Sequence, residues 1–133
     1  MNTDISPANI HPLVLAYVGD AVFEVLVREK LASSGNSKTG ELNRMALDFV
    51  TAKNQCRVCD KLSEYLTEAE QDIFRRAKNA KGNSGPRSVT VYEYRKATGL
   101  EAVFGYNHLM GNDLRNKELF NLIFDIKKEK DND

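Results

Sequence analysis

Hydrophobic residues recur along most of the chain at steps of three and four, the spacing of helices that bury one face. The pattern predicts six helices, at about 11–31, 38–50, 52–66, 67–80, 88–110 and from 113 onward. Clusters of glycine, serine, asparagine and proline separate several of them. The sequence shows no alternating pattern typical of strands and no internal repeat. It therefore predicts an all-α fold class and a single domain over 1–133, with a core at about 11–126.

The first predicted helix carries one carboxylate inside an apolar run. Between Leu13 and Phe23, Asp20 is the only charged residue, so we expect it to be buried. A buried carboxylate has to be ion-paired, hydrogen-bonded, protonated or bound to a metal. Two interpretations stay open at this point: a structural aspartate that pairs with an arginine or a backbone amide, and a functional acid.

The fifth predicted helix repeats this feature with Glu101, the only charge in the stretch 97–105. Small residues on both sides would let another helix approach closely: Ala97, Gly99, Ala102 and Gly105. We therefore expect Asp20 and Glu101 to face each other, where two carboxylates would share a proton or hold a cation. Oxygen ligands alone favour Mg²⁺, or Mn²⁺ in its place. The alternative is an ion pair of Glu101 with Arg28 or Arg95.

A local excess of positive charge lies between the fourth and fifth helices. The chain has 19 basic and 19 acidic residues, so its net charge gives no argument for binding nucleic acid. From Arg75 to Lys96, however, there are seven basic residues and one acidic residue, Glu93. A glycine-containing basic loop can follow a phosphate backbone without reading bases, which suits double-stranded RNA. The alternative is a solvated loop without a binding role.

Other features narrow the class of protein. The N-terminus has neither the basic start nor the apolar block of a signal peptide, and charges interrupt the most apolar helix, so we expect a cytoplasmic protein without a membrane span. Cys56 and Cys59 form a Cys-x-x-Cys motif with no second cysteine pair and no suitably spaced histidine. We interpret them as two small buried thiols.

Two motifs resemble those of a known family. The run 15–27, with Gly19-Asp20-Ala21-Val22 at its centre, resembles the signature helix of the ribonuclease III nuclease domain. Leu100-Glu101-Ala102 with Gly105 is similar to the second acidic motif of that domain, in the same order about eighty residues later. Standard members carry a double-stranded-RNA-binding domain after the nuclease domain. We expect none here, and in this the chain resembles the Mini-ribonuclease III branch of the family. The longer members carry further acids where this chain has Leu13, Ala16 and Thr98.

The resemblance implies a ribonuclease III fold, a homodimer and a Mg²⁺-dependent endoribonuclease that cuts double-stranded RNA, maturing the ends of the 23S ribosomal RNA precursor. Asp20 and Glu101 would be the catalytic metal ligands, and Glu24 a supporting or ion-pair residue. A ribosomal protein bound to the substrate is a further candidate partner. The alternative function is a catalytically inactive RNA-binding scaffold. The residues expected to bind RNA are Arg75, Arg76, Lys78, Lys81 and Arg87.

The first helix is also too apolar for the core of one small domain. We expect part of its surface to close a two-fold dimer interface. The candidate residues on that surface are Val14, Tyr17, Val18 and Ala21.

Overall fold

The computed structural model describes residues 5–35, 38–82 and 90–131. In these residues the chain forms six α-helices and two short 3₁₀ turns, and no strand, which confirms the all-α prediction. The helices are α1 (Pro12–Ala32), α2 (Thr39–Val50), α3 (Ala52–Leu62), α4 (Glu68–Lys78), α5 (Val91–Leu109) and α6 (Asp113–Asp131). The 3₁₀ turns are η1 (Pro7–Asn9) and η2 (Ser63–Tyr65).

Two of the helices begin with the same local device. Before α4, the hydroxyl of Thr67 accepts the amide proton of Glu70, and the Glu70 carboxylate accepts the amide proton of Thr67. Before α5, Thr90 and Glu93 make the same reciprocal pair. Each pair satisfies backbone donors that the first turn of a helix leaves free. The second capping box overrides the β-forming residues Val91 and Tyr92, because a capped helix that buries one face outweighs single-residue propensity.

The expected ends of two helices differ from the observed ones. The third helix was expected to reach residue 66, but α3 ends at Leu62 and η2 follows it, so the chain tightens into a 3₁₀ turn there. The fifth was expected from residue 88, which lies outside the described residues, and its observed start is Val91. Cys59 is buried as expected, whereas Cys56 is only half-buried, and neither forms a disulfide.

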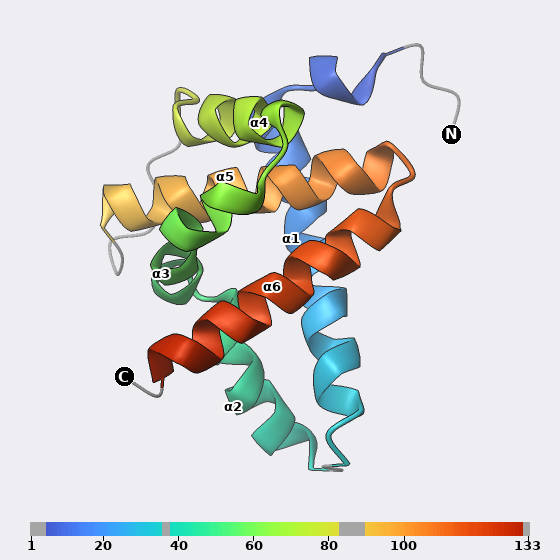
Figure 1. The fold of residues 1–133 in the computed structure, drawn as a ribbon, viewed down its shortest axis with the longest axis vertical. Coiled ribbons are helices and arrows are strands. Elements are labelled where there is room, and N and C mark those ends of the chain that lie inside the picture. Colours follow the sequence, from blue (N-terminus) through green and yellow to red (C-terminus); the bar gives the residue numbers. More distant parts are fainter. Residues whose placement is uncertain (1–4, 36–37, 83–89, 132–133) are drawn as a thin grey trace.

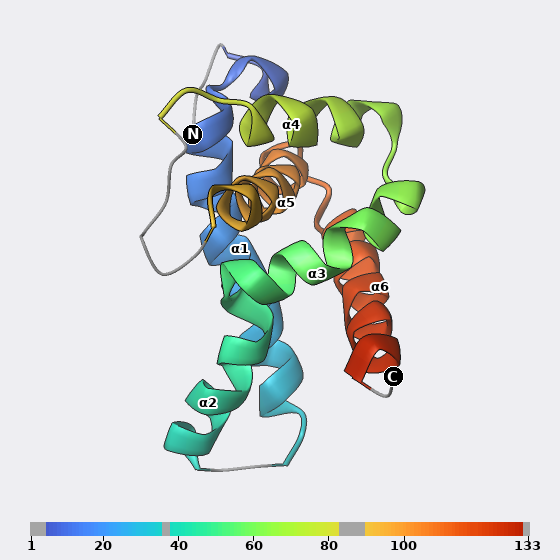
Figure 2. The ribbon, with the colours of Figure 1, turned by 90° about the vertical axis from the view of Figure 1, so that its left-hand side faces the viewer.

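Helix α5 is the centre of the fold. It packs against α1, α3, α4 and α6, and Figure 2 looks almost along its axis, with α1, α3 and α4 around it. Figure 1 shows α1 and α5 crossing, with α2 beside the C-terminal half of α1 and α6 running across the lower part of the molecule. The site described below lies where the first long helix meets this central one. No helix in the described ranges is both long and apolar enough to span a membrane.

The core is continuous from α1 through α5 to α6. Its centre is an aromatic cluster in which Phe23 meets Phe104 and Phe120 edge to face, at ring-centroid distances of 5.3 and 5.7 Å. Edge-to-face pairs add to the stabilisation from apolar burial alone. The cluster fixes one turn of α1 against α5 and α6, and it holds the crossing next to it in place.

The crossing of α1 and α5 depends on two glycines. A Cβ atom at Gly19 would lie 1.6 Å from the carbonyl oxygen of Glu101, and one at Gly105 would lie 2.0 Å from the carbonyl oxygen of Leu15. Because the obstacles are backbone atoms, no side-chain rotation could relieve the clash. The prediction that small residues let another helix approach this part of α5 is therefore confirmed, and the partner is α1.

Candidate active site

A pocket of about 300 Å³ opens beside the crossing. Helix α1 contributes Leu13, Ala16, Tyr17 and Asp20 to its wall, α5 contributes Tyr94, Thr98 and Glu101, and Gly82 closes one side. The spacing on each helix is the reason these residues meet. Residues three, four and seven apart lie on one face of a helix, so each helix presents a single stripe to the pocket.

The crossing brings Asp20 and Glu101 together. They line the same pocket, and their carboxyl groups are hydrogen-bonded to each other. The expectation that they face each other is met, and the pairing of Glu101 with Arg28 or Arg95 is not what the structure shows. Arg28 instead bonds Glu24 at 2.9 Å.

The expected burial of Asp20 is wrong. Its residue surface is exposed, whereas Glu101 is half-buried and its neighbours on α5 are buried. The reason is geometric: Gly19 occupies the contact with α5, and the next residue lies about 100° further round the helix. Asp20 therefore points from the edge of the crossing into the open pocket. The apolar run that suggested burial belongs to the other faces of α1.

Asp20 and Glu101 lie so close together that ionisation of one carboxyl group disfavours ionisation of the other. Burial, and then the hydrogen bond and negative charge of Asp20, raise the pKa of Glu101 to about 9. At neutral pH the glutamate thus keeps its proton, unless a cation takes the place of that proton. A divalent cation with hard oxygen ligands fits this donor set, because it would neutralise both carboxylates at once.

The donor set is small. Among the residues that the structure describes, no group of three or more His, Cys, Asp or Glu side chains could hold a metal ion. The residues at which the longer family members carry acids, Leu13, Ala16 and Thr98, line the pocket without adding a carboxylate. Glu24, one turn beyond Asp20, is half-buried and ion-paired with Arg28, as expected of a supporting or ion-pair residue.

The expected RNA-binding residues differ in how free their charges are. Arg75 is ion-paired with Asp72, and Arg76 bonds the carbonyl oxygen of Ala8 and lies 3.6 Å from the same aspartate. Lys78 is half-buried and Lys81 is exposed. Lys81 directly precedes Gly82, which lines the pocket of Asp20 and Glu101, so this end of the basic loop lies at the rim of the pocket. Arg87 lies outside the described residues.

Sequence reasoning missed one residue of the pocket. Tyr94 is half-buried in its wall, and the carbonyl oxygen of Tyr94 accepts a 2.8 Å hydrogen bond from the Thr98 hydroxyl. A signal was available, because Tyr94 and Thr98 precede Glu101 by seven and three residues and so share its helix face. The β-forming residues at 89–92 make the helix start ambiguous in the sequence, so the stripe is not evident from it.

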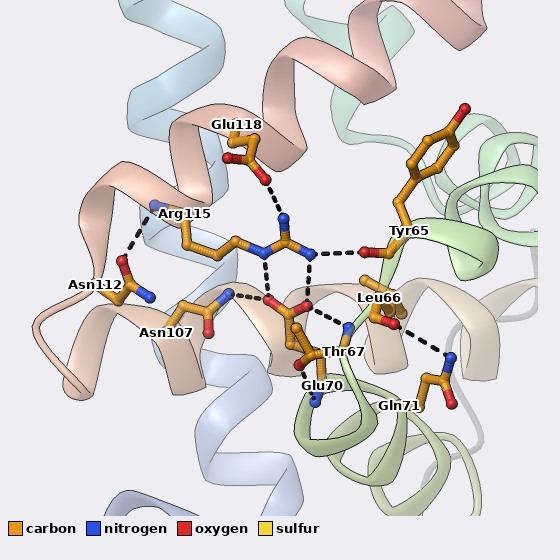
Figure 3. A network of polar contacts seen from close by, with 9 residues as sticks. All are labelled: Tyr65, Leu66, Thr67, Glu70, Gln71, Asn107, Asn112, Arg115 and Glu118. Atoms are coloured by element: carbon orange, nitrogen blue, oxygen red, sulfur yellow. Dashed lines mark hydrogen bonds and ion pairs between the residues drawn. The ribbon is translucent and has the colours of Figure 1, made fainter.

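A second cluster of charged and polar residues joins α4, α5 and α6 (Figure 3). It shares no residue with the pocket of Asp20 and Glu101. The buried Glu70 accepts hydrogen bonds from Nε and Nη2 of Arg115, at 3.0 and 2.8 Å, and from Nδ2 of Asn107 at 2.8 Å. The Thr67 amide adds a fourth, at 2.9 Å. Burial alone would raise the pKa of Glu70, but these donors hold it below its usual value.

Fold and site together define an all-helical nuclease domain with a paired-carboxylate centre beside a basic loop. The ribonuclease III domain family matches residues 13–112, and the chain belongs to this family. It is 42% identical to the Mini-ribonuclease 3 of Symbiobacterium thermophilum over 91% of this chain and 93% of that one. It is 40% identical to the Mini-ribonuclease 3 of Enterococcus faecalis, over 84% and 86%.

A solved structure supports the same assignment. The crystal structure of a Fusobacterium nucleatum protein superposes with a TM-score of 0.78 at 34% sequence identity. The match covers 88% of this chain and 93% of the other. The resemblance stated from the two acidic motifs is thereby confirmed, and it extends to the helical fold as a whole.

Proposed function

We propose that Asp20 and Glu101 form the catalytic metal site of this endoribonuclease, which hydrolyses phosphodiesters in double-stranded RNA and matures the ends of the 23S ribosomal RNA precursor. The observation that carries the proposal is the direct pairing of the two carboxyl groups in an open pocket. Two facing acids are destabilised by each other, and no lysine or arginine within the described part of the chain lines their pocket to compensate. Such a pair is completed by a cation.

Asp20, Glu101 and Glu24 have different roles in this proposal. Asp20, on the exposed side, and Glu101, on the half-buried side, hold their oxygens on the two walls of the pocket, with Glu101 losing its proton when the cation binds. A bound Mg²⁺, or Mn²⁺ in its place, would supply Lewis acidity that activates water and offsets charge on the phosphate and the leaving oxygen. Glu24 does not hold the cation in this proposal, because its charge is already paired with Arg28 one turn further along α1.

The basic residues supply affinity rather than chemistry. Lys78, Lys81 and Arg87 are the candidates for direct phosphate contacts, with Lys81 next to the pocket rim. Arg75 and Arg76 would contribute a weaker field, because Asp72 already neutralises part of their charge. Contacts of this kind position a duplex by its backbone and carry no base sequence.

The acting species is a homodimer. On the outer face of α1, Val14 is 49% exposed, Tyr17 81% and Val25 54%, and Ala21 between them is exposed as well. A contiguous apolar stripe of this kind is typical of a protein interface. A second copy is the occupant we infer, because Tyr17 belongs both to the stripe and to the wall of the catalytic pocket. Dimerisation would thus complete the rim of each site.

The activity is tested with purified protein and a long RNA duplex. We expect cleavage with Mg²⁺, none with a chelator, and none of single-stranded RNA or duplex DNA of the same sequence. The alternative function, an inactive RNA-binding scaffold, predicts duplex binding without cleavage under all of these conditions. A ribosomal precursor with and without its bound ribosomal protein would show whether that protein is a partner in the reaction.

The dimer is tested separately. Light scattering at micromolar concentration should give twice the mass of the 133-residue chain. A lysine in place of Val14 should lower that mass toward the monomer, since it places a charge inside the apolar stripe. A monomeric parent with full activity would rule out this part of the proposal.

A further inference from the structure

The catalytic pocket is larger than its two carboxylates require. Asp20 and Glu101 occupy one end, and the stripe on α5 continues from Glu101 through Thr98 to Tyr94. Seven residues of helix separate Tyr94 from Glu101, which is about 10 Å along the axis. A strand whose scissile phosphate lies at the carboxylates would therefore reach Tyr94 with a neighbouring nucleotide. This step rests on the proposed function of the two acids.

The hydroxyl of Tyr94 is available for a ligand. The residues that the structure describes form no hydrogen bond with it, although the side chain is half-buried. The adjacent Thr98 hydroxyl differs, because it already donates to the Tyr94 carbonyl oxygen at 2.8 Å. A phenol both donates and accepts, so Tyr94 is the group in this part of the wall that can bind a polar substrate atom in either direction.

The surroundings of Tyr94 favour a neutral partner. Among the residues that the structure describes, the pocket wall carries two carboxylates and no lysine or arginine. At Tyr94 itself a second phosphate would meet a neutral phenol, which offers one hydrogen bond and no opposite charge. A ribose hydroxyl carries no charge, can donate to or accept from the phenol, and is the group that distinguishes RNA from DNA at a given position.

We propose that Tyr94 is a specificity-determining residue that hydrogen-bonds the 2′-hydroxyl of one ribose next to the scissile phosphodiester. It contributes to the selection of RNA over DNA inside the catalytic pocket itself. Leu13 and Ala16 on α1 line the same pocket and contribute apolar surface to it.

The test combines a protein change with a substrate change. Tyr94→Phe deletes one oxygen and keeps the ring. A set of short RNA duplexes carries a single 2′-deoxynucleotide at each position in turn around the cleavage site. We expect Tyr94→Phe to lower kcat/KM on the all-RNA duplex about fivefold, the effect of one lost neutral hydrogen bond. At one position, the 2′-deoxy substitution should lower kcat/KM of the parent by a similar factor and leave the variant unchanged.

The other positions and variants serve as controls. Any other 2′-deoxy substitution should affect parent and variant equally. Tyr65→Phe is the matched control, because it removes the same oxygen from a tyrosine outside the pocket, and it should retain parental activity. A Tyr94→Phe variant that equals the parent on all-RNA duplex, or whose loss adds to every 2′-deoxy effect, overturns the proposal; the latter outcome would indicate a phosphate contact or a packing role.

Folding and catalysis are checked independently. The melting temperature of Tyr94→Phe should match that of the parent within about 2 °C, since no described hydrogen bond is lost. Duplex binding is measured in the Asp20→Asn background with and without Tyr94→Phe, and the expected loss of affinity on all-RNA duplex should vanish at the same 2′-deoxy position. If Asp20→Asn cleaves as well as the parent, the proposed catalytic centre fails, whatever the result at Tyr94.

Discussion

Glu70 and Glu101 are glutamates withdrawn from solvent on adjacent helices, but their surroundings are opposite. Glu70 is surrounded by donors: a bidentate arginine, an amide side chain and a backbone amide. Glu101 faces another carboxylate across an open pocket. The first has a lowered pKa and the second a raised one. A carboxylate whose partners are all hydrogen-bond donors of the protein stabilises the fold, whereas one that faces another acid keeps a proton or, as we propose for Glu101, binds a cation.

The largest expected effect is the loss of cleavage when either acid of the pocket is replaced by its amide. Asp20→Asn and Glu101→Gln keep the shape of the pocket but remove the charges that hold the cation, so cleavage of duplex RNA should fall by several orders of magnitude. Folding should be at least as stable as in the parent, because the fold no longer has to hold two carboxyl groups against each other. Single-turnover cleavage and thermal unfolding check both expectations.

Asp48→Asn, at an exposed position on α2, is the matched control and should cleave normally. Raised Mn²⁺ should restore part of the activity of Glu101→Gln, since one ligand remains. Unfolding of Asp20→Asn would show that Asp20 is a structural partner and that its catalytic assignment is wrong.

The next largest effect is expected at Glu70, where substitution should lower stability and leave activity nearly unchanged. Glu70→Gln removes the buried counter-charge of Arg115, which keeps only its ion pair with the exposed Glu118, and loss of one partner from such a pair costs about 3 kcal/mol of stability. The free energy of unfolding in urea should fall by about this amount. Cleavage per folded molecule should stay within about threefold of the parent. Glu68→Gln, on the exposed side of the same turn, should change neither quantity; a large loss of activity in folded Glu70→Gln would contradict the separation of the two clusters.

The two glutamates should also give opposite dependences of stability on pH. Glu101 in the metal-free fold keeps its proton up to about pH 9, whereas the unfolded chain loses it near 4.5. Between these values the folded state binds more protons, so its stability falls as pH rises and levels off above about 9. Glu70 has a lowered pKa in the fold, so its contribution is present above about 4.5 and is lost as pH falls through the lowered value.

Melting temperatures between pH 3 and pH 9.5 in the presence of a chelator measure this contrast. Glu101→Gln should remove the decline on the alkaline side, and Glu70→Gln should flatten the decline on the acid side. Added Mg²⁺ should raise the melting temperature of the parent more at pH 8 than at pH 5, because binding displaces the proton of Glu101. Identical profiles for parent and Glu101→Gln would mean that the two acids do not share a proton.

The smallest effect concerns charges outside both clusters. Replacing Lys78, Lys81 and Arg87 together with alanine should weaken duplex binding and reduce its salt dependence by roughly 0.7–0.9 log units for each lost contact. Turnover at saturating RNA should stay within about tenfold, since the charges bind ground and transition states alike. Binding titrations at several salt concentrations measure both quantities. Arg75→Ala, which removes a charge already paired with Asp72, should have little effect; unchanged binding in the triple variant would favour a merely solvated loop.

The sequence predicts those structural features that depend on residues close together in the chain, and not those that depend on distant ones. The helices, and the meeting of Asp20 with Glu101, follow from apolar periodicity and from two acids placed among small residues. The environment of Glu70 does not, because Arg115 lies 45 residues away and Asn107 37 residues away, and no pattern near Glu70 points to either. Its capping role with Thr67 was the part visible in the sequence.

Two further differences have local causes that were hidden. The capping box of Thr90 and Glu93 has the same spacing as that of Thr67 and Glu70, but residues of strand-forming type between them masked it. Asp20 is exposed because Gly19, and not Asp20, makes the contact with α5. The apolar run around these two residues does not show which of them faces the other helix. The role of a pocket residue such as Tyr94 appears only when two helices are placed side by side.

The crossing at Gly19 and Gly105 also sets an order of events while the chain is being made. The two glycines are 86 residues apart in the sequence, so at ribosomal rates of about 5–20 residues per second α1 waits roughly 4–17 s for α5. Until then Leu15, Phe23 and Val27 have no partner from α5, and the pocket does not exist. A ribonuclease translated from RNA is thus inert on its own ribosome until most of its length has been synthesised. Its first helix, being the most apolar, is the segment that a nascent-chain chaperone would hold in the interval.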